Sequence, residues 1–180
     1  MFTTNDLLIV IDMQNDFIDG ALGTKEAAAI VDAVAERIRR HNGSVYYTLD
    51  THGDDYLQTQ EGHYLPVVHC VKGSDGWALN DTIARALKMQ NATAFEKPTF
   101  GSTRLMRAVE AAHLERPFTS ITLIGVCTDI CVIANAMLLK AALPNVPIYI
   151  DAALCAGVTP QSHDNALAAM EACQMAVIHA

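Results

Sequence analysis

Short hydrophobic runs alternate along the chain with longer segments whose hydrophobic positions recur every three or four residues. The short runs are nearly uninterrupted, which is typical of strands covered on both faces of a parallel sheet. They span residues 6–12, 44–50, 92–97, 119–126, 146–152 and 176–180. The periodic segments predict helices over residues 24–41, 78–89, 102–115, 129–143 and 160–174. Because strands alternate with helices, we expect one three-layer α/β domain over residues 1–180: a six-stranded, mostly parallel sheet with helices on both faces.

A polar segment at residues 51–77 interrupts this alternation. A connection of this length is uncommon in a compact domain, and such loops are usually functional or disordered. Histidines and acidic residues are frequent in the segment, which favours a functional loop.

The charge balance and the cysteines limit the classes of protein to which the chain can belong. With 12 basic and 20 acidic residues the net charge is −8, and no basic patch is visible that would bind nucleic-acid phosphates. No apolar run reaches the roughly 18 residues of a membrane helix, and the N-terminus lacks the features of a signal peptide. The five cysteines form no spaced framework. We therefore expect reduced thiols in a cytoplasmic protein with neither nucleic-acid nor membrane partners.

Three chemically useful side chains follow predicted strands, although they are far apart in the sequence. Asp12 closes LLIVI, Lys97 closes ATAFE, and Cys131 lies just after the strand ITLIGV. The carboxyl ends of parallel strands meet at one edge of a sheet, so these side chains can converge there. An acid, an ammonium and a thiol are the parts of an activated-thiol site for acyl transfer. Cys131 would lie in the first turn of a helix, capped by Thr128 or Asp129, where the helix dipole would lower its pKa.

Each of these residues also has an ordinary structural explanation. Most free cysteines pack in cores, Asp12 could cap a turn, and Lys97 could be a solvated lysine at a strand end. Cys127 competes with Cys131 and could form a redox pair with it, although CxxC rather than CxxxC is the usual redox spacing. A phosphoryl-transfer site at Asp12 would need a second Asp two residues later, where the chain has Gln14.

A second group of polar residues follows the strand SVYYTLD. Asp50 and His52 share one face of an extended backbone, because residues two apart point the same way. Glu61 and His69 can join them from the loop, with His63 a spare ligand and Asp54 and Asp55 as substitutes. Two imidazoles and two carboxylates suit zinc, iron or manganese. The alternative interpretation is a polar loop with scattered histidines.

Taken together, the motifs resemble the cysteine hydrolase superfamily of isochorismatases and nicotinamidases. The matching stretches are LLIVIDMQNDF, YTLDTH, LPVVHCVKGSDGW, FEKPTFGST and LIGVCTDICVIANA. The resemblance implies a six-stranded parallel sheet and a catalytic triad of Asp12, Lys97 and Cys131. It also implies that Cys127 follows a non-proline cis peptide. The backbone N–H groups of Cys127 and Cys131 would then form the oxyanion hole.

Within the superfamily, the metal-ligand pattern resembles the nicotinamidases rather than the metal-free isochorismatases. The resemblance places one divalent ion, zinc ahead of iron or manganese, on Asp50, His52, Glu61 and His69. It also implies a substrate pocket lined by Phe17 and Phe100. One stretch departs from the pattern, because this chain has Leu65-Pro66-Val67-Val68 where nicotinamidases commonly place Trp or Phe.

The sequence therefore predicts an amidase of nicotinamidase type that converts a small carboxamide, such as nicotinamide, to the acid and ammonia through a cysteine thioester. The alternatives are hydrolysis of another small amide, hydrolysis of an enol ether as in isochorismatases, and a non-catalytic binding domain. The helix after Cys131 is apolar nearly all round, and the superfamily favours oligomers, so we expect a homodimer or a larger homo-oligomer.

Overall fold

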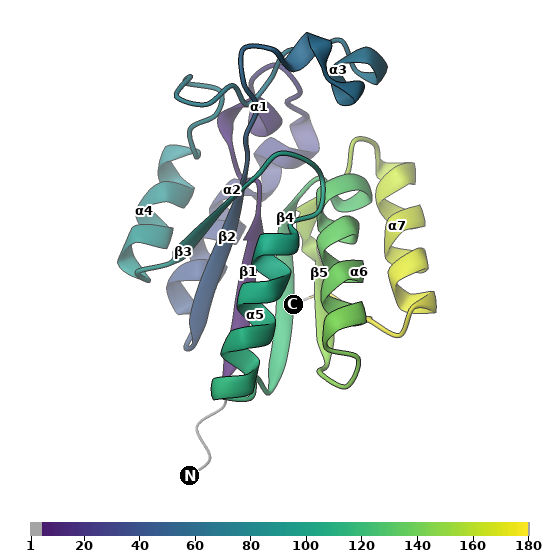
Figure 1. The fold of residues 1–180 in the computed structure, drawn as a ribbon. Helices are drawn as coiled ribbons and strands as arrows, with labels where there is room; N and C mark the ends of the chain where they lie inside the picture. Colours follow the sequence, from purple (N-terminus) through teal and green to yellow (C-terminus); the bar gives the residue numbers. More distant parts are fainter. Residues whose placement is uncertain (1–4, 180) are drawn as a thin grey trace.

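Six parallel strands form the central sheet of the computed structural model, which describes residues 5–179 (Figure 1). The strands are β1 (Asp6–Ile11), β2 (Ser44–Asp50), β3 (Thr93–Lys97), β4 (Ser120–Val126), β5 (Ile148–Ala156) and β6 (Ala176–Ile178). Their order across the sheet is β3-β2-β1-β4-β5-β6, and every neighbouring pair is parallel. The order reverses between β1 and β4, which is where open α/β sheets bind ligands.

Helices cover both faces of this sheet, as predicted. The main ones are α2 (Lys25–Arg40), α4 (Asp81–Met89), α5 (Thr103–Glu115), α6 (Ile133–Ala142) and α7 (Pro160–Ala172). In Figure 1, α5 and α6 lie in front of the sheet and α2 lies behind it. The three-layer α/β prediction is confirmed, and the sheet is entirely rather than mostly parallel.

The side chains of β1 explain why the sheet needs both helical layers. Leu7, Ile9 and Ile11 belong to the core cluster that includes residues of α5, α6 and α7. Leu8 and Val10 belong to the cluster that includes residues of α2 and α4. Since alternate residues of a strand point to opposite faces, an uninterrupted apolar run has to be covered on both sides.

The predicted elements differ from the observed ones mainly in the loops and at the element ends. Strand β5 continues to Ala156, beyond the predicted end at residue 152, because Cys155 and Ala156 pair with the end of β4. The predicted polar loop 51–77 contains a 3₁₀ turn (Tyr56–Gln58) and a short helix, α3 (Gln60–Tyr64). A further one-turn helix, α1 (Asn15–Ile18), was not predicted, because four residues show no periodicity.

Two other predicted ranges differ from the observed elements. The helix expected from residue 129 begins instead as a π-helical turn, Thr128–Val132, which passes into α6. The closing strand expected at 176–180 is observed as Ala176–Ile178, and Ala180 lies outside the described residues. Among residues 5–179, none of the helices combines the length and apolar character that a membrane crossing requires.

Candidate active site

Asp12, Lys97 and Cys131 lie together at the carboxyl edge of the sheet. Asp12 follows β1, Lys97 ends β3, and Cys131 lies in the π-helical turn after β4. The Lys97 Nζ atom is 2.7 Å from Asp12 Oδ2 and 3.5 Å from Cys131 Sγ. It is also 3.2 Å from Oδ1 of Asp50, the last residue of β2. Residues from four strands or their ends are thus brought into one cluster of charged and nucleophilic groups.

Lys97 is the centre of this cluster and is a buried cation. Its side chain is inaccessible to solvent, as is that of Asp12. Burial alone would lower the pKa of Lys97, but its interactions with Asp12, Cys131 and Asp50 outweigh burial and raise it. Lys97 is therefore a buried ammonium held against the carboxylates of Asp12 and Asp50, and its interpretation as a solvated strand-end lysine is wrong.

Asp12 is held in a conformation that the chain rarely adopts. Its φ of +48° lies in the left-handed region, which non-glycine residues seldom occupy. The Thr48 hydroxyl donates a hydrogen bond of 2.6 Å to Asp12 Oδ1, and the Asp12 N–H donates one of 3.2 Å to the Thr48 hydroxyl oxygen. Burial and the charge on Asp50 raise the pKa of Asp12, against the lowering effect of Lys97 and Thr48. A carboxylate with a raised pKa is a stronger base, suited to accept a proton from a thiol.

The electrostatics of Cys131 differ from the sequence-based expectation. We expected the helix dipole to lower its pKa, but burial and the neighbouring Asp12 charge raise the pKa well above that of a free thiol, even with Lys97 opposing them. The side chain is only 5 % exposed. The expectation was wrong because the first turn is buried. Desolvation of the thiolate raises the pKa of Cys131 by more than the helix dipole lowers it. The thiol therefore needs a base when it reacts.

The turn that carries Cys131 is fixed by hydrogen bonds that sequence reasoning missed. The Val132 N–H donates to the Cys127 carbonyl, five residues back, over 3.0 Å. The buried Asn135 side chain donates to the carbonyls of Cys131 and Phe100 and accepts from the Ser102 N–H. Neither Thr128 nor Asp129 caps the turn as expected, because the N-cap is Cys127 and no side chain bonds there.

Cys127 stands at the other end of this turn. The peptide between Val126 and Cys127 is cis, as the family resemblance implied. Cys127 and Cys131 are both free thiols. Burial and the charge on Asp129 raise the pKa of Cys127 to about 12. Redox pairs depend on a thiol of lowered pKa, so the raised values at both positions argue against a CxxxC redox site.

Four side chains beside the triad form a candidate metal site. One ligand atom from each of Asp50, His52, Glu61 and His69 lies within 4.8 Å of all the others. The shortest distances join His52 Nε2 to Asp50 Oδ2, 2.9 Å, and His69 Nε2 to the same oxygen, 3.5 Å. Oε1 of Glu61 is 3.7 Å from both ring nitrogens. Within the described chain, the spare ligands considered above, His63, Asp54 and Asp55, are not part of this group.

The surroundings of these four residues fit a divalent cation. Nδ1 of His69 lies 2.8 Å from the carbonyl of Val67, which leaves Nε2 directed at the cluster. Burial and the charge on Asp50 raise the pKa of Glu61. The two carboxylates therefore repel each other, and a bound cation would offset this repulsion. The Gln14 side chain fixes the backbone of Asp50 through two hydrogen bonds. Its Nε2 donates to the Asp50 carbonyl over 2.9 Å, and its Oε1 accepts from the Asp50 N–H over 2.7 Å.

Cys131 and three of the four candidate metal ligands, Asp50, Glu61 and His69, line one cavity. Its volume is about 260 Å³, and its walls include Cys131, Asp50 and His69. Phe17 and Phe100 both line it, where the resemblance placed the substrate pocket. None of the described residues that line it is Lys or Arg. The cavity can therefore hold a small, largely apolar molecule between a buried thiol and a metal-binding group.

A buried acid, amine and thiol beside a metal-ligand group, at the switch point of a parallel sheet, form a candidate hydrolase site. The sequence profile of the isochorismatase domain family matches residues 6–180. The chain therefore belongs to the isochorismatase family. A search of curated proteins found no match.

Solved structures show the same fold over nearly the full length of the chain. A pyrazinamidase/nicotinamidase from Streptococcus mutans UA159 is 24 % identical with a TM-score of 0.81, over 97 % of this chain and 100 % of that one. The pyrazinamidase of Pyrococcus horikoshii in complex with zinc is 22 % identical with a TM-score of 0.77, over 97 % and 98 %. N-carbamoylsarcosine amidase from Thermoplasma acidophilum is 27 % identical with a TM-score of 0.72, over 97 % and 95 %.

Proposed function

We propose that this protein is a metal-containing amidohydrolase of nicotinamidase type, which hydrolyses a small carboxamide through a thioester on Cys131. The observation that carries the proposal is that Lys97 Nζ lies close to both the Asp12 carboxylate and the Cys131 thiol, while three of the four candidate metal ligands line the same cavity as Cys131. The amidase relatives and the zinc-bound pyrazinamidase support it.

The residues divide the reaction between them. Asp12 accepts the thiol proton as Cys131 attacks the carboxamide carbon, and Lys97 stabilises the negative charge on both groups. The backbone N–H groups of Cys127 and Cys131 stabilise the oxyanion, to which each such donor can contribute about 3 kcal/mol. Asp12 then gives this proton to the departing nitrogen, which leaves as ammonia. It later takes a proton from the water that hydrolyses the thioester and returns it to the released Cys131 thiolate.

A divalent ion held by Asp50, His52, Glu61 and His69 would supply a Lewis-acid contact for a polar atom of the substrate. The chain's own contribution is to orient those ligands and to exclude water. Phe17 and Phe100 provide apolar walls against which a flat ring can lie.

The alternatives fit the site less well. An enol ether such as isochorismate carries carboxylates, and the described lining of the cavity offers them no Lys or Arg partner. A non-catalytic binding domain would have no use for a buried Asp12–Lys97 pair, since buried ion pairs cost desolvation energy. Hydrolysis of another small amide remains the second candidate, favoured by the likeness to N-carbamoylsarcosine amidase.

The metal gives the first test. Purified protein should carry about one divalent ion per chain, zinc ahead of iron or manganese, measured by elemental analysis. The ion should be released as the pH falls below about 6, since protons compete for the histidines. His52→Ala should remove the ion and raise the KM for nicotinamide more than it lowers kcat, measured as ammonia release.

His63→Ala is the matched control, because His63 is exposed on α3 and outside the metal group. It should change neither metal content nor KM. Metal-free protein that is fully active on a carboxylate-bearing enol ether, and inactive on amides, would reject the proposal in favour of isochorismatase chemistry.

Two expectations about the whole protein stay predictions. The free thiols at all five cysteines agree with a cytoplasmic location. The apolar, half-buried residues Ile133, Met137 and Leu138 on α6 agree with a homodimer or larger assembly.

A further inference from the structure

A second hollow opens beside the cavity that contains Cys131. Its volume is about 560 Å³, twice that of the inner cavity, and it lies within the roughly 300–1,000 Å³ of typical small-molecule sites. The two hollows share four wall residues: Glu61, Leu65, Phe100 and Ile130. Because these residues border both hollows, the inner cavity and this outer hollow, the vestibule, lie next to each other.

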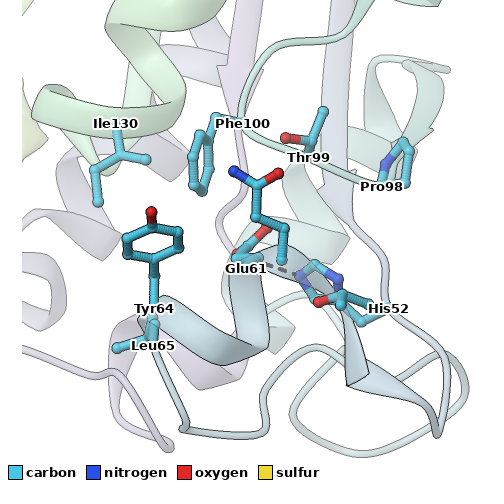
Figure 2. Close-up of a pocket in the computed structure, with 10 residues that line it drawn as sticks. His52, Glu61, Tyr64, Leu65, Pro98, Thr99, Phe100 and Ile130 are labelled. Carbon is cyan, nitrogen blue, oxygen red and sulfur yellow. Dashed lines mark ion pairs between the residues drawn. The ribbon is translucent and has the colours of Figure 1, made fainter. Parts of the chain in front are cut away.

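The vestibule presents unpartnered apolar surface. Tyr64 is 85 % exposed, Phe100 43 % and Leu65 38 %. In Figure 2 the Tyr64 ring rises from α3 with its hydroxyl toward Ile130, while Phe100 descends on the facing side. Exposed aromatic rings on both sides of an opening form an apolar slot, into which another ring can stack and lose its contact with water.

The charges at both hollows restrict what can enter. None of the described residues that line either one is Lys or Arg, while Glu61 lines both and Asp50 lines the inner one. Lys97 is inaccessible and is engaged by Asp12 and Asp50. An ion at the metal group would bring two positive charges, which the two carboxylates offset. An anionic substituent in the vestibule would therefore have no cationic side chain to pair with in the described lining, whereas a neutral substituent needs none.

We propose that the substrate is a neutral primary amide with an aromatic or apolar extension, whose carboxamide reaches Cys131 while the extension lies in the vestibule between Tyr64 and Phe100. This rests on the proposed amidase function and narrows its substrate class. The reaction is unchanged: the C–N bond breaks, water supplies the oxygen of the new C–O bond, and ammonia leaves. Tyr64 acts as a specificity residue, since it lines only the vestibule.

Three amides test this proposal with metal-loaded protein: nicotinamide, nicotinamide with a phenyl group meta to the carboxamide, and the phenyl compound with a carboxylate on its phenyl ring. We expect the neutral phenyl compound to have a kcat/KM about tenfold above that of nicotinamide, mainly through a lower KM, because burial of an aromatic group favours binding. The carboxylate compound should lose this gain.

Two variants locate the effect. Tyr64→Ala should remove most of the gain for the phenyl compound and leave nicotinamide hydrolysis nearly unchanged. Leu57→Ala is the matched control, because Leu57 is also an exposed hydrophobic residue of the same loop but lines neither hollow. It should change the kcat/KM of none of the three compounds.

Binding to the Cys131→Ala protein separates this inference from the proposed function. Calorimetry should give a Kd about tenfold lower for the neutral phenyl compound than for nicotinamide, and the added Tyr64→Ala change should abolish the difference. Tight, Tyr64-dependent binding without ammonia release from any amide would support the vestibule and reject the amidase. Nicotinamide hydrolysis with no preference for the phenyl compound, or an equal effect of Tyr64→Ala on both, would reject the vestibule and leave the amidase standing.

Discussion

Replacement of Cys131 by alanine should reduce ammonia release from nicotinamide by about 10⁵-fold or more, since loss of the nucleophile removes the covalent route entirely. The thiol is the group that touches Lys97 at 3.5 Å and lines the cavity. The fold should survive, because a small buried side chain is replaced by a smaller one, and circular dichroism with a urea titration would verify this.

Two other cysteines provide controls for that result. Cys127→Ala keeps the backbone N–H that we assign to the oxyanion hole and should retain most of the activity. Cys173→Ala changes an exposed thiol after α7 and should have no effect. Full activity in Cys131→Ala, together with loss in Cys127→Ala, would transfer the role of nucleophile to Cys127.

Replacement of Asp12 by asparagine should lower kcat by about 10²- to 10⁴-fold, because the amide keeps the shape of the side chain but cannot accept the thiol proton. Catalysis should depend on the base Asp12 more strongly than the sequence suggested, because the pKa of Cys131 is raised rather than lowered. Asp129→Asn is the matched control, because it removes a carboxylate from the π-helical turn that carries Cys131. The Oδ1 atom of Asp129 accepts a hydrogen bond from the Val158 N–H and does not contact Lys97.

The pH profile gives Asp12 a distinct signature. The base must be ionised to work, so activity should fall as the pH drops through its pKa. Because that pKa is raised in the folded protein, the acidic limb of kcat/KM should lie above the ordinary aspartate value of about 3.9. Measured at saturating metal, this limb should disappear in the residual activity of Asp12→Asn. An identical limb in the variant would show that another group titrates.

The strands, and the grouping of Asp12, Lys97 and Cys131 at one edge of the sheet, could be predicted from local pattern and topology. A strand covered on both faces needs an unbroken apolar run, and β2 was predicted with its observed bounds, Ser44–Asp50. The ends of parallel strands converge by topology alone, so Asp12, Lys97 and Cys131 could be grouped without any knowledge of their contacts. The spacing of Asp50 and His52 likewise predicted that both would face one metal group.

The electrostatics and the supporting hydrogen bonds could not be predicted in the same way. The pKa of Cys131 depends on how deeply its turn is buried, which only the packed structure reveals. Gln14, Thr48 and Asn135 each bond to residues from other segments, and nothing local distinguishes a polar side chain with a distant partner from one in solvent. The signal available for Gln14 and Thr48 was their position in or beside buried strands, where a polar group needs a partner.

The central claim, a thioester on Cys131, is tested most directly by mass spectrometry of a rapidly quenched reaction with nicotinamide. Metal-loaded protein should release ammonia, and the peptide that contains Cys131 should carry the acyl group as an added mass. The Cys131→Ala protein should show neither signal, while Cys127→Ala should show both. Ammonia released at full rate without an acyl group on Cys131, or an acyl group on a different residue, would contradict the account.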